Sequence, residues 1–212
     1  MGTVTLVFTD IEGSTRLLDE LGTTAYREAL GEHRRVVREA FARFEGYEVD
    51  YESDAFFYAF ASAQAAVDAV AEAMHGLEAG PIRIRVGVHT GSPEVDPPKY
   101  VGRDVHLTAR VMSAGHGGQV LLSQTSHELV EVEATDLGEH RLKDFPERVS
   151  LFQLGDGSFP PLKTISNTNL PRPASSFVGR EQEVSDVVAL LQDGARLVTL
   201  SGRFRGRLQV RR

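Results

Sequence analysis

Apolar and polar residues alternate over the first 155 positions in a way that predicts strands and helices in turn. Short β-branched and aromatic runs predict strands, and apolar residues recurring every three to four positions predict helices. The predicted elements are a strand over 4–9, a helix over 14–21, a longer helix from 23 or 24 to 44, a hairpin of strands 47–51 and 55–60, a helix over 63–77 and a strand over 82–89. This order matches the βαββαβ motif of ferredoxin-like folds, so we expect an α/β (α+β) domain with an antiparallel-rich sheet covered by helices on one face.

Weaker patterns complete the chain. They predict an irregular segment over 93–99, a helix over 104–113, a strand over 119–122, a short helix over 125–129 and a closing antiparallel pair at 137–142 and 149–154. Gly, Pro and Asn then become frequent, which is typical of an extended linker. We therefore expect a domain over 1–155, a linker over 156–180 and the start of a second domain over 181–212, with a helix at 184–191 and a strand at 197–200.

Composition and charge narrow the class of protein. The 212 residues are 41% hydrophobic and 25% charged, which excludes a mostly disordered, collagen-like or coiled-coil chain. No apolar run reaches 18 residues and no basic flank precedes the first strand, so we expect neither a membrane span nor a signal peptide. The absence of cysteine excludes disulfides and cysteine nucleophiles and fits a reducing, cytoplasmic location. The net charge of −7 argues against direct nucleic-acid binding.

Residues 8–15, Phe-Thr-Asp-Ile-Glu-Gly-Ser-Thr, hold the first chemical motif. Asp10 ends the first strand, and a turn at Gly13 leads to a helix that starts at Ser14 and Thr15. This geometry directs backbone N–H groups and a carboxylate to one place, where a phosphate and a divalent cation can bind. On the simpler interpretation Asp10 tightens a turn and Ser14 caps the helix.

The hairpin turn holds a second carboxylate, Asp54. If the hairpin lies beside the first strand, Asp54 approaches Asp10, and two carboxylates beside a phosphate cradle form a two-metal site. Each aspartate alone says little, because Asp is common in turns. Together, on adjacent central strands, they favour the metal site.

Five segments, in order, resemble motifs of the class III nucleotide cyclases. They are residues 7–15 with the first aspartate, 53–57 with the second, 85–91 in the central strand, 102–110 in the following helix and 141–144 in a late strand. The resemblance covers about residues 3–154. It implies a homodimer with active sites at the subunit interface. Such an enzyme would convert ATP or GTP to the 3′,5′-cyclic nucleotide and pyrophosphate in intracellular signalling.

The resemblance also implies roles for individual residues. Asp10 and Asp54, with the Ile11 carbonyl, would hold two Mg²⁺ or Mn²⁺ ions. The partner's Arg110 would stabilise charge on the transferring phosphate, and the partner's Lys143 would hold the terminal phosphates. An isolated Arg on a helix or Lys on an edge strand is usually only a solvated charge, so both roles depend on the order of the motifs.

Two residues depart from the family pattern at the site. His106 stands where the family usually has the Asn that orients the ribose, and a misfit of this hydrogen bond would lower the rate about a hundredfold or more. Ser53 stands where Gly usually precedes the metal aspartate, and a positive φ there would strain the turn and could displace Asp54.

The residues that would recognise the base are also unusual. Asp50 stands where adenylate cyclases commonly have Lys, and Lys99 where they commonly have Asp or Thr, so donor and acceptor are exchanged. Asp50 would accept from guanine N1–H and Lys99 would donate to O6, which predicts GTP over ATP. The sequence supports equally the alternative that both are solvated surface charges and that no base is selected.

The C-terminal part resembles the start of the ATPase module in transcriptional regulators that are fused to cyclase domains. Residues 202–207 lack the spacing, Lys and Ser/Thr of a phosphate-binding loop, and we expect residues 203–212 to be a flexible basic tail. Two hypotheses follow. The chain is a nucleotide cyclase, or it is a catalytically weak or inactive module that dimerises and binds nucleotide as the regulatory part of a transcriptional regulator.

Overall fold

The computed structural model describes residues 2–165 apart from Pro98, and a few short pieces of the remaining chain. Two compact units result, Met1–Asn167 and Thr168–Arg212. The first unit holds all the residues of the expected site.

The second unit is described only in part, at residues 185, 188–190, 192–193, 199–201 and 209–211. The described backbone is helical within the predicted helix 184–191. The expected tail over 203–212 contains a strand, because β10 (Thr199–Ser201) pairs antiparallel with β11 (Gln209–Arg211). The predicted linker beyond residue 165 and the segment 202–207 lie outside the described residues.

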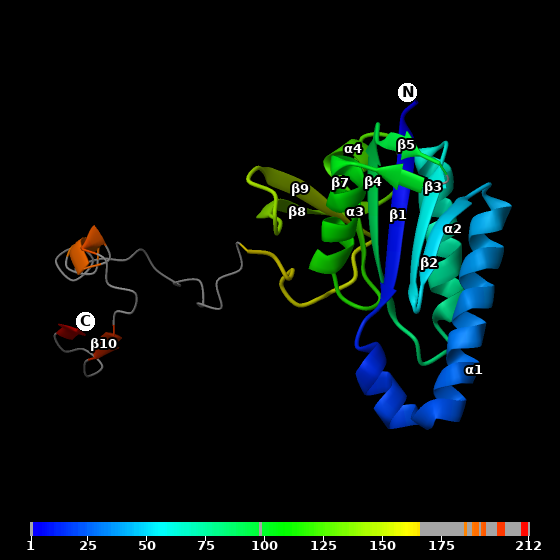
Figure 1. Ribbon diagram of the computed structural model, residues 1–212, viewed down its shortest axis with the longest axis horizontal. Helices are drawn as coiled ribbons and strands as arrows, with labels where there is room; N and C mark the ends of the chain where they lie inside the picture. The colour runs from blue at the N-terminus through cyan, green and yellow to red at the C-terminus, as the bar shows by residue number, and fades with distance from the viewer. Residues whose placement is uncertain are drawn as a thin grey trace. The chain divides into compact units, whose positions relative to one another are not determined.

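The first unit alternates strands and helices along the chain (Figure 1). Its elements are β1 (Val4–Ile11), α1 (Ser14–Arg43), β2 (Tyr47–Glu52), β3 (Ala55–Phe60), α2 (Ala63–Leu77), β4 (Ile84–Gly91), β5 (Glu94–Asp96), β6 (Lys99–Val101), α3 (Arg103–Ala114), β7 (Val120–Ser123), α4 (Gln124–His127), β8 (Ala134–Arg141) and β9 (Arg148–Leu154). No helix in the described part of the chain has the length and apolar character needed to cross a membrane.

Seven strands form one sheet in the order β2-β3-β1-β4-β7-β9-β8. Each pair of neighbours is antiparallel except β4 and β7, which run parallel. The order of the first four strands is that of a βαββαβ unit, so the predicted ferredoxin-like motif is confirmed. Strands β1 and β4 lie at the centre of the sheet and carry the longest register, from Val4 opposite Gly91 to Ile11 opposite Ile84.

Helices pack on both faces of this sheet. Helices α1 and α2 cover one face, where Phe41 and Val70 join a core with strand residues such as Val7. Helix α3 lies on the other face, where a Cβ at Gly87 of β4 would stand 2.7 Å from Met112 Cα. The expected cover on one face therefore holds for α1 and α2 only, because Gly87 allows α3 to approach the opposite face.

Two glycines shape α1 and its start. Gly22 has φ 76° and ψ 161° inside α1, which breaks the helix between the two helical segments predicted from the sequence. Gly13 is the N-cap, in the left-handed conformation with φ 70° and ψ 34°, and no side chain caps the helix. Ser14 is thus the first residue of the helix and not its cap, because Gly13 adopts a conformation that other residues avoid.

The other differences occur where little apolar surface is buried. The expected irregular segment over 93–99 contains the strands β5 and β6, which are mostly exposed and carry no apolar alternation. Strand β8 starts at Ala134, before the predicted residue 137, and it lies at the edge of the sheet with mostly exposed residues. Hydrophobic periodicity does not find β5 and β6, and it finds only the later part of β8, since backbone pairing defines the rest.

Residues 156–165, which we call the strap, follow β9 and pack against the rest of the first unit. Leu162 is 6% exposed and joins a core with residues of α3, β7 and β9. The Lys163 N–H donates to the Ala114 carbonyl at 2.9 Å, and the Ile165 N–H donates to the Arg141 carbonyl at 3.0 Å. This part of the expected linker is therefore tied to the domain.

Candidate active site

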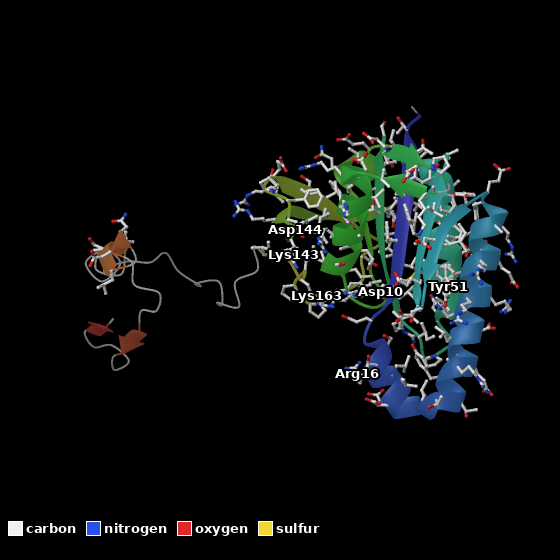
Figure 2. The ribbon with its side chains drawn as sticks, viewed as in Figure 1. Asp10, Arg16, Tyr51, Lys143, Asp144 and Lys163 are labelled. Atoms are coloured by element: carbon white, nitrogen blue, oxygen red, sulfur yellow. The ribbon has the colours of Figure 1, made fainter. Side chains whose placement is uncertain are left out.

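Asp10 lies near the end of β1 and is held by an arginine on the neighbouring strand. Arg85 of β4 is its cross-strand partner, and Arg85 Nε donates to Asp10 Oδ2 at 3.0 Å while a second guanidinium N–H contacts the same oxygen. The side chains are 21% exposed for Asp10 and 22% for Arg85. The Asp10 carboxylate is therefore partly desolvated and is paired with the Arg85 guanidinium. Figure 2 labels Asp10 near the end of β1 that leads into α1.

Asp54 occupies the turn between β2 and β3. Strand β3 pairs with β1, and Thr9 lies opposite Phe56, so the turn that holds Asp54 adjoins the end of β1 where Asp10 lies. The expected placement of the hairpin beside the first strand is confirmed. The role of the two carboxylates as metal ligands stays a prediction.

The turn before Asp54 is strained as its sequence suggested. Ser53 has φ 58°, a left-handed conformation that suits Gly. The Tyr51 hydroxyl donates to the Ser53 carbonyl, and Arg34 donates to the same oxygen at 3.4 Å. These two donors, from β2 and α1, hold the turn in place.

The loop between β1 and α1 presents a helix start next to Asp10. Gly13 O accepts the first helical bond, from Leu17 N at 3.0 Å, so the N–H groups of the first turn have no partner within the helix. Tyr26, which sequence reasoning missed, lies near this loop. Burial and the charge of Asp54 raise the pKa of Tyr26, and a hydrogen bond with Ser14 opposes that rise. Tyr26, which follows the break in α1 at Gly22, therefore lies close to both motifs.

Glu12, also missed, ties the same loop to distant residues. Its Oε2 accepts from the Gly117 N–H at 2.7 Å, and its Oε1 accepts from Lys163 Nζ. His116 Nδ1 is 3.7 Å from Oε1. Hydrogen bonds from Lys163 and Gly117 lower the pKa of Glu12, so this carboxyl stays ionised. Only the tertiary structure reveals this contact, because Lys163 is 151 positions away in the sequence.

The two residues expected to recognise the base are brought together. Lys99 Nζ of β6 donates to Asp50 Oδ2 of β2, across 49 positions of the sequence. The side chains are 46% exposed for Asp50 and 52% for Lys99, and the bond with Lys99 lowers the pKa of Asp50. The pair therefore satisfies its own charges at the surface, which is compatible with either interpretation of these residues.

The residues expected to come from the partner subunit lie on α3 and in the turn after β8. His106 is exposed on α3, and Arg110 donates to Asp144 Oδ2 at 2.6 Å. Lys143 is exposed in the turn between β8 and β9, whereas the resemblance placed it in a late strand. Figure 2 shows Lys143 and Asp144 beside β8 and β9, apart from Asp10 of the same chain.

A buried polar network fixes the start of α3. His89 Nδ1 lies 2.8 Å from Ser123 Oγ, and its Nε2 lies 3.4 Å from Asp104 Oδ1. The Ser92 N–H donates to the other oxygen of Asp104 at 2.8 Å. Ser123 is 2% exposed, so this Ser, His and Asp set cannot reach a substrate and instead orients the helix that carries His106.

Known proteins share both the sequence and the fold of this domain. A profile of the adenylate and guanylate cyclase catalytic domain matches residues 1–155. An uncharacterized protein of Mycobacterium tuberculosis is 34% identical over 199 residues, which cover 87% of this chain and 69% of that protein. A receptor-type adenylate cyclase of Trypanosoma congolense is 31% identical over 71% of this chain, which is 27% of the relative's length.

Solved structures agree with these matches. An adenylate cyclase of Trypanosoma brucei, solved in its monomeric state, superposes with a TM-score of 0.71 at 27% identity, over 78% of this chain and 96% of that one. The guanylate cyclase domain of a Catenaria anguillulae protein, solved with GTP, has the same fold with a TM-score of 0.64 at 18% identity, over 73% of this chain and 96% of that one.

The strand order, the paired aspartate loops and these matches define the class of protein as a nucleotide cyclase domain. The chain belongs to the adenylate and guanylate cyclase catalytic domain family. Its membership and its relatives support nucleotide cyclase activity in general terms.

Proposed function

We propose that this protein converts ATP or GTP to the 3′,5′-cyclic nucleotide and pyrophosphate, as a homodimer in intracellular signal transduction. The observation that carries the proposal is the meeting of two acidic motifs at one end of the sheet, with Asp10 near the end of β1 and Asp54 in the turn that leads into the adjacent β3. The helix start after Gly13 adds N–H donors beside them.

The donors at this place suit Mg²⁺ or Mn²⁺. Asp10, Asp54 and the Ile11 carbonyl would offer hard oxygen atoms, and substrate phosphates commonly complete the coordination of such ions. The described residues contain no cluster of three or more His, Cys, Asp or Glu that would hold a metal without substrate. Arg85 already balances the charge of Asp10, so the carboxylate must exchange this partner when a cation arrives. A pair of bound ions would favour ionisation of the ribose 3′-hydroxyl and offset the charge of the phosphates.

The chain's own groups would position the reacting atoms. Backbone N–H groups after Gly13 would hold phosphate oxygens, and the 3′-oxygen would attack the α-phosphorus while the bond to pyrophosphate breaks. The partner's Arg110 would offset charge on the α-phosphate, and the partner's Lys143 would hold the leaving pyrophosphate. Arg110 must leave Asp144 to do so, since the two form an ion pair within this chain.

Guanine is the base that the pair Asp50 and Lys99 would favour. An ionised Asp only accepts and a Lys only donates, so Asp50 would meet guanine N1–H and Lys99 would meet O6. Adenine would place a lone pair opposite Asp50 and amine hydrogens opposite Lys99. Two such mismatches correspond to a preference of about a hundredfold. The two side chains lie at one place in this structure, and each would have to exchange the other for the base.

A second function, nucleotide binding without turnover, is favoured by specific features. His106 replaces the ribose-orienting Asn, and Ser53 has a strained positive φ next to Asp54. Such a module would dimerise and serve as the regulatory part of a signalling protein or a transcriptional regulator.

One assay separates these functions. The purified chain is incubated with ATP and with GTP, each in Mn²⁺ and in Mg²⁺, and the cyclic nucleotide and pyrophosphate are quantified. We expect cyclic product, faster from GTP, and its loss in Asp54→Ala but not in the control Asp19→Ala on the exposed surface of α1. Binding of nucleotide without product from a folded dimer would establish the second function instead.

The base proposal has its own test. The exchange of Asp50→Lys together with Lys99→Asp should move the preference toward ATP. A wild-type protein that prefers ATP, with a double variant that does not shift, would show that these residues do not select the base.

A further inference from the structure

The strap connects two loops that the proposed function assigns to the site. It leaves β9, and its Gly157 carbonyl accepts from Gln153 Nε2 at 2.6 Å. Its Pro161 carbonyl lies 3.1 Å from His116 Nε2, and its Leu162 side chain is buried in the core beneath α3. Thus two side chains bound to strap carbonyls, and one buried leucine, hold the strap before it reaches either loop.

The first loop that the strap contacts lies between β1 and α1. Lys163 Nζ donates to Glu12, whose second oxygen accepts from the Gly117 N–H. Glu12 stands between Asp10 and the left-handed Gly13, so it belongs to the short run that turns the chain from the strand into the helix. Figure 2 labels Lys163 and Asp10 toward the same end of the sheet.

The second segment that the strap contacts is the end of β8, just before the turn that holds Lys143. Ile165 N donates to the Arg141 carbonyl at 3.0 Å, and Thr164 Oγ1 lies 3.2 Å from His140 Nδ1. Arg141 is the last residue of β8, two positions before Lys143. Three consecutive strap residues, 163–165, therefore touch the segments next to the expected metal ligand and next to the expected phosphate-binding lysine.

We propose that Lys163 is a positioning residue, which holds Glu12 so that the loop after Asp10 keeps the conformation that receives the substrate phosphates. This proposal rests on the proposed function, because the loop is taken as the phosphate site. A site binds its ligand more tightly when neighbouring residues hold the ligand-contacting groups in position before the ligand binds. Lys163 contributes by this means and does not itself touch the nucleotide.

The surroundings make this ion pair more effective than an average surface pair. Lys163 is 40% exposed and Glu12 is 36% exposed, and isolated pairs of this kind contribute about 1 kcal/mol or less. Much of the free-energy cost of forming such a pair is lost side-chain entropy. Here the backbone bonds of the strap restrain Lys163 and the Gly117 N–H restrains Glu12, so less entropy is lost. A Cβ at Gly117 would stand 3.2 Å from Glu12 Cβ, so the glycine allows this close approach.

The contact also gives the strap a way to act on the site. The strap comes directly before the second unit in the sequence, so any event that pulls residues 163–165 from the domain would release Glu12. By linkage, nucleotide bound to the loop must in turn stabilise the strap.

The test compares four variants of the full chain: Lys163→Gln, Lys163→Arg, the charge exchange Glu12→Lys with Lys163→Glu, and Arg35→Gln as a control that breaks an exposed ion pair on α1. Hydrogen exchange of the hydrogen-bonded Glu12, Leu17 and Gly117 amides is measured without nucleotide or metal, and that of the Lys163 and Ile165 amides with and without nucleotide. Nucleotide binding and steady-state kinetics are measured with GTP and with ATP. Thermal unfolding confirms that each variant folds.

We expect Lys163→Gln to speed exchange of the Glu12, Leu17 and Gly117 amides and to raise the KM for nucleotide about threefold to fivefold, with little change in kcat. Lys163→Arg should restore both, and Arg35→Gln should change neither. The charge exchange should restore only part of the loss, because a lysine at position 12 cannot accept from the Gly117 N–H. In the wild-type protein, nucleotide should slow exchange of the Lys163 and Ile165 amides.

Two results would overturn the inference. One is unchanged exchange of the Glu12, Leu17 and Gly117 amides in a folded Lys163→Gln variant, and the other is an equal loss in Lys163→Arg. A wild-type protein that makes no cyclic nucleotide would contradict the proposed function alone, because loop exchange and nucleotide binding are measured without turnover.

Discussion

At the scale of single residues, buried groups without partners stand out. His33 of α1 is fully buried, neither ring nitrogen has a hydrogen-bond partner, and its ring centroid lies 5.6 Å from that of Phe56. Burial, with a smaller effect from the neighbouring Arg34, lowers the pKa of His33 to about 4. His33 therefore has a lower pKa in the folded protein than in the unfolded chain, where its ordinary pKa applies.

This residue predicts acid sensitivity. Between the folded pKa of about 4 and an unfolded pKa of about 6.5, the unfolded state binds the proton and the folded state does not, so stability falls as pH falls. From about pH 7 to about pH 5 the loss from this group is about 2 kcal/mol. His33→Leu should remove that part of the loss, measured by urea unfolding at both pH values.

The exposed His75→Gln serves as the matched control, and it should keep the wild-type dependence on pH. Burial also lowers the pKa of His89, which acts in the same direction in every variant and cancels in the comparison. Equal pH dependence in His33→Leu and wild type would show that His33 is protonated when folded.

Ser53 gives a second prediction at this scale. A non-glycine residue at φ 58° costs about 1 kcal/mol relative to Gly, so Ser53→Gly should raise the free energy of unfolding by about that amount. The same substitution at Ser62, which has φ −122° and whose hydroxyl accepts from the Ala65 N–H, should not stabilise. Both are measured by denaturant unfolding, and stabilisation by Ser62→Gly alone would contradict the argument.

At the scale of elements, close packing between β4 and α3 decides where the helix lies. Gly87 has no room for a Cβ, because Met112 of α3 packs its backbone there. The network of His89, Ser123 and Asp104 then fixes the start of the same helix. The position of α3 therefore depends on two neighbouring residues of β4, although α3 carries His106 and Arg110.

Gly87→Ala tests this packing. The added methyl group would stand 2.7 Å from Met112 Cα, so the helix must shift, and we expect a loss of about 2–3 kcal/mol or more in the free energy of unfolding. Gly31→Ala is the matched control, because nothing lies within 4 Å of its Cβ position inside α1. It should stabilise by about 1 kcal/mol or less. Equal stability of the two variants would place α3 elsewhere.

At the scale of the whole molecule, the expected site is divided within one chain. Asp10 lies near the end of β1, whereas Arg110 and Lys143 lie on α3 and in the β8–β9 turn, and Arg110 is paired with Asp144. The proposed homodimer would bring the second group of residues from a partner to the first. Activity would then depend on protein concentration in the range where the dimer forms.

Mixed dimers test this arrangement. Asp10→Ala and Arg110→Ala chains should each be inactive alone, and mixing them should restore one intact site per heterodimer. Activity of the mixture, compared with each variant alone, is the measurement. Heterodimers shown to form without any recovered activity would contradict a shared site.

The sequence by itself determined the elements that bury an apolar stripe and the motifs that are contiguous along the chain. The order of the βαββαβ unit, the break in α1 at Gly22, the hairpin turn with Asp54 and the loop of Asp10 and Gly13 were all predictable. Hydrophobic periodicity and turn residues are local signals, so these features need no knowledge of distant contacts.

Only the tertiary structure decided which distant charges meet. The ion pairs of Asp10 with Arg85, Glu12 with Lys163 and Arg110 with Asp144 join residues 34 to 151 positions apart. The first residues of the edge strand β8 and the hairpin of β5 and β6 likewise carry no apolar pattern. A polar side chain gains its partner from the folded arrangement of the sheet and helices, and no periodicity along the chain records that choice.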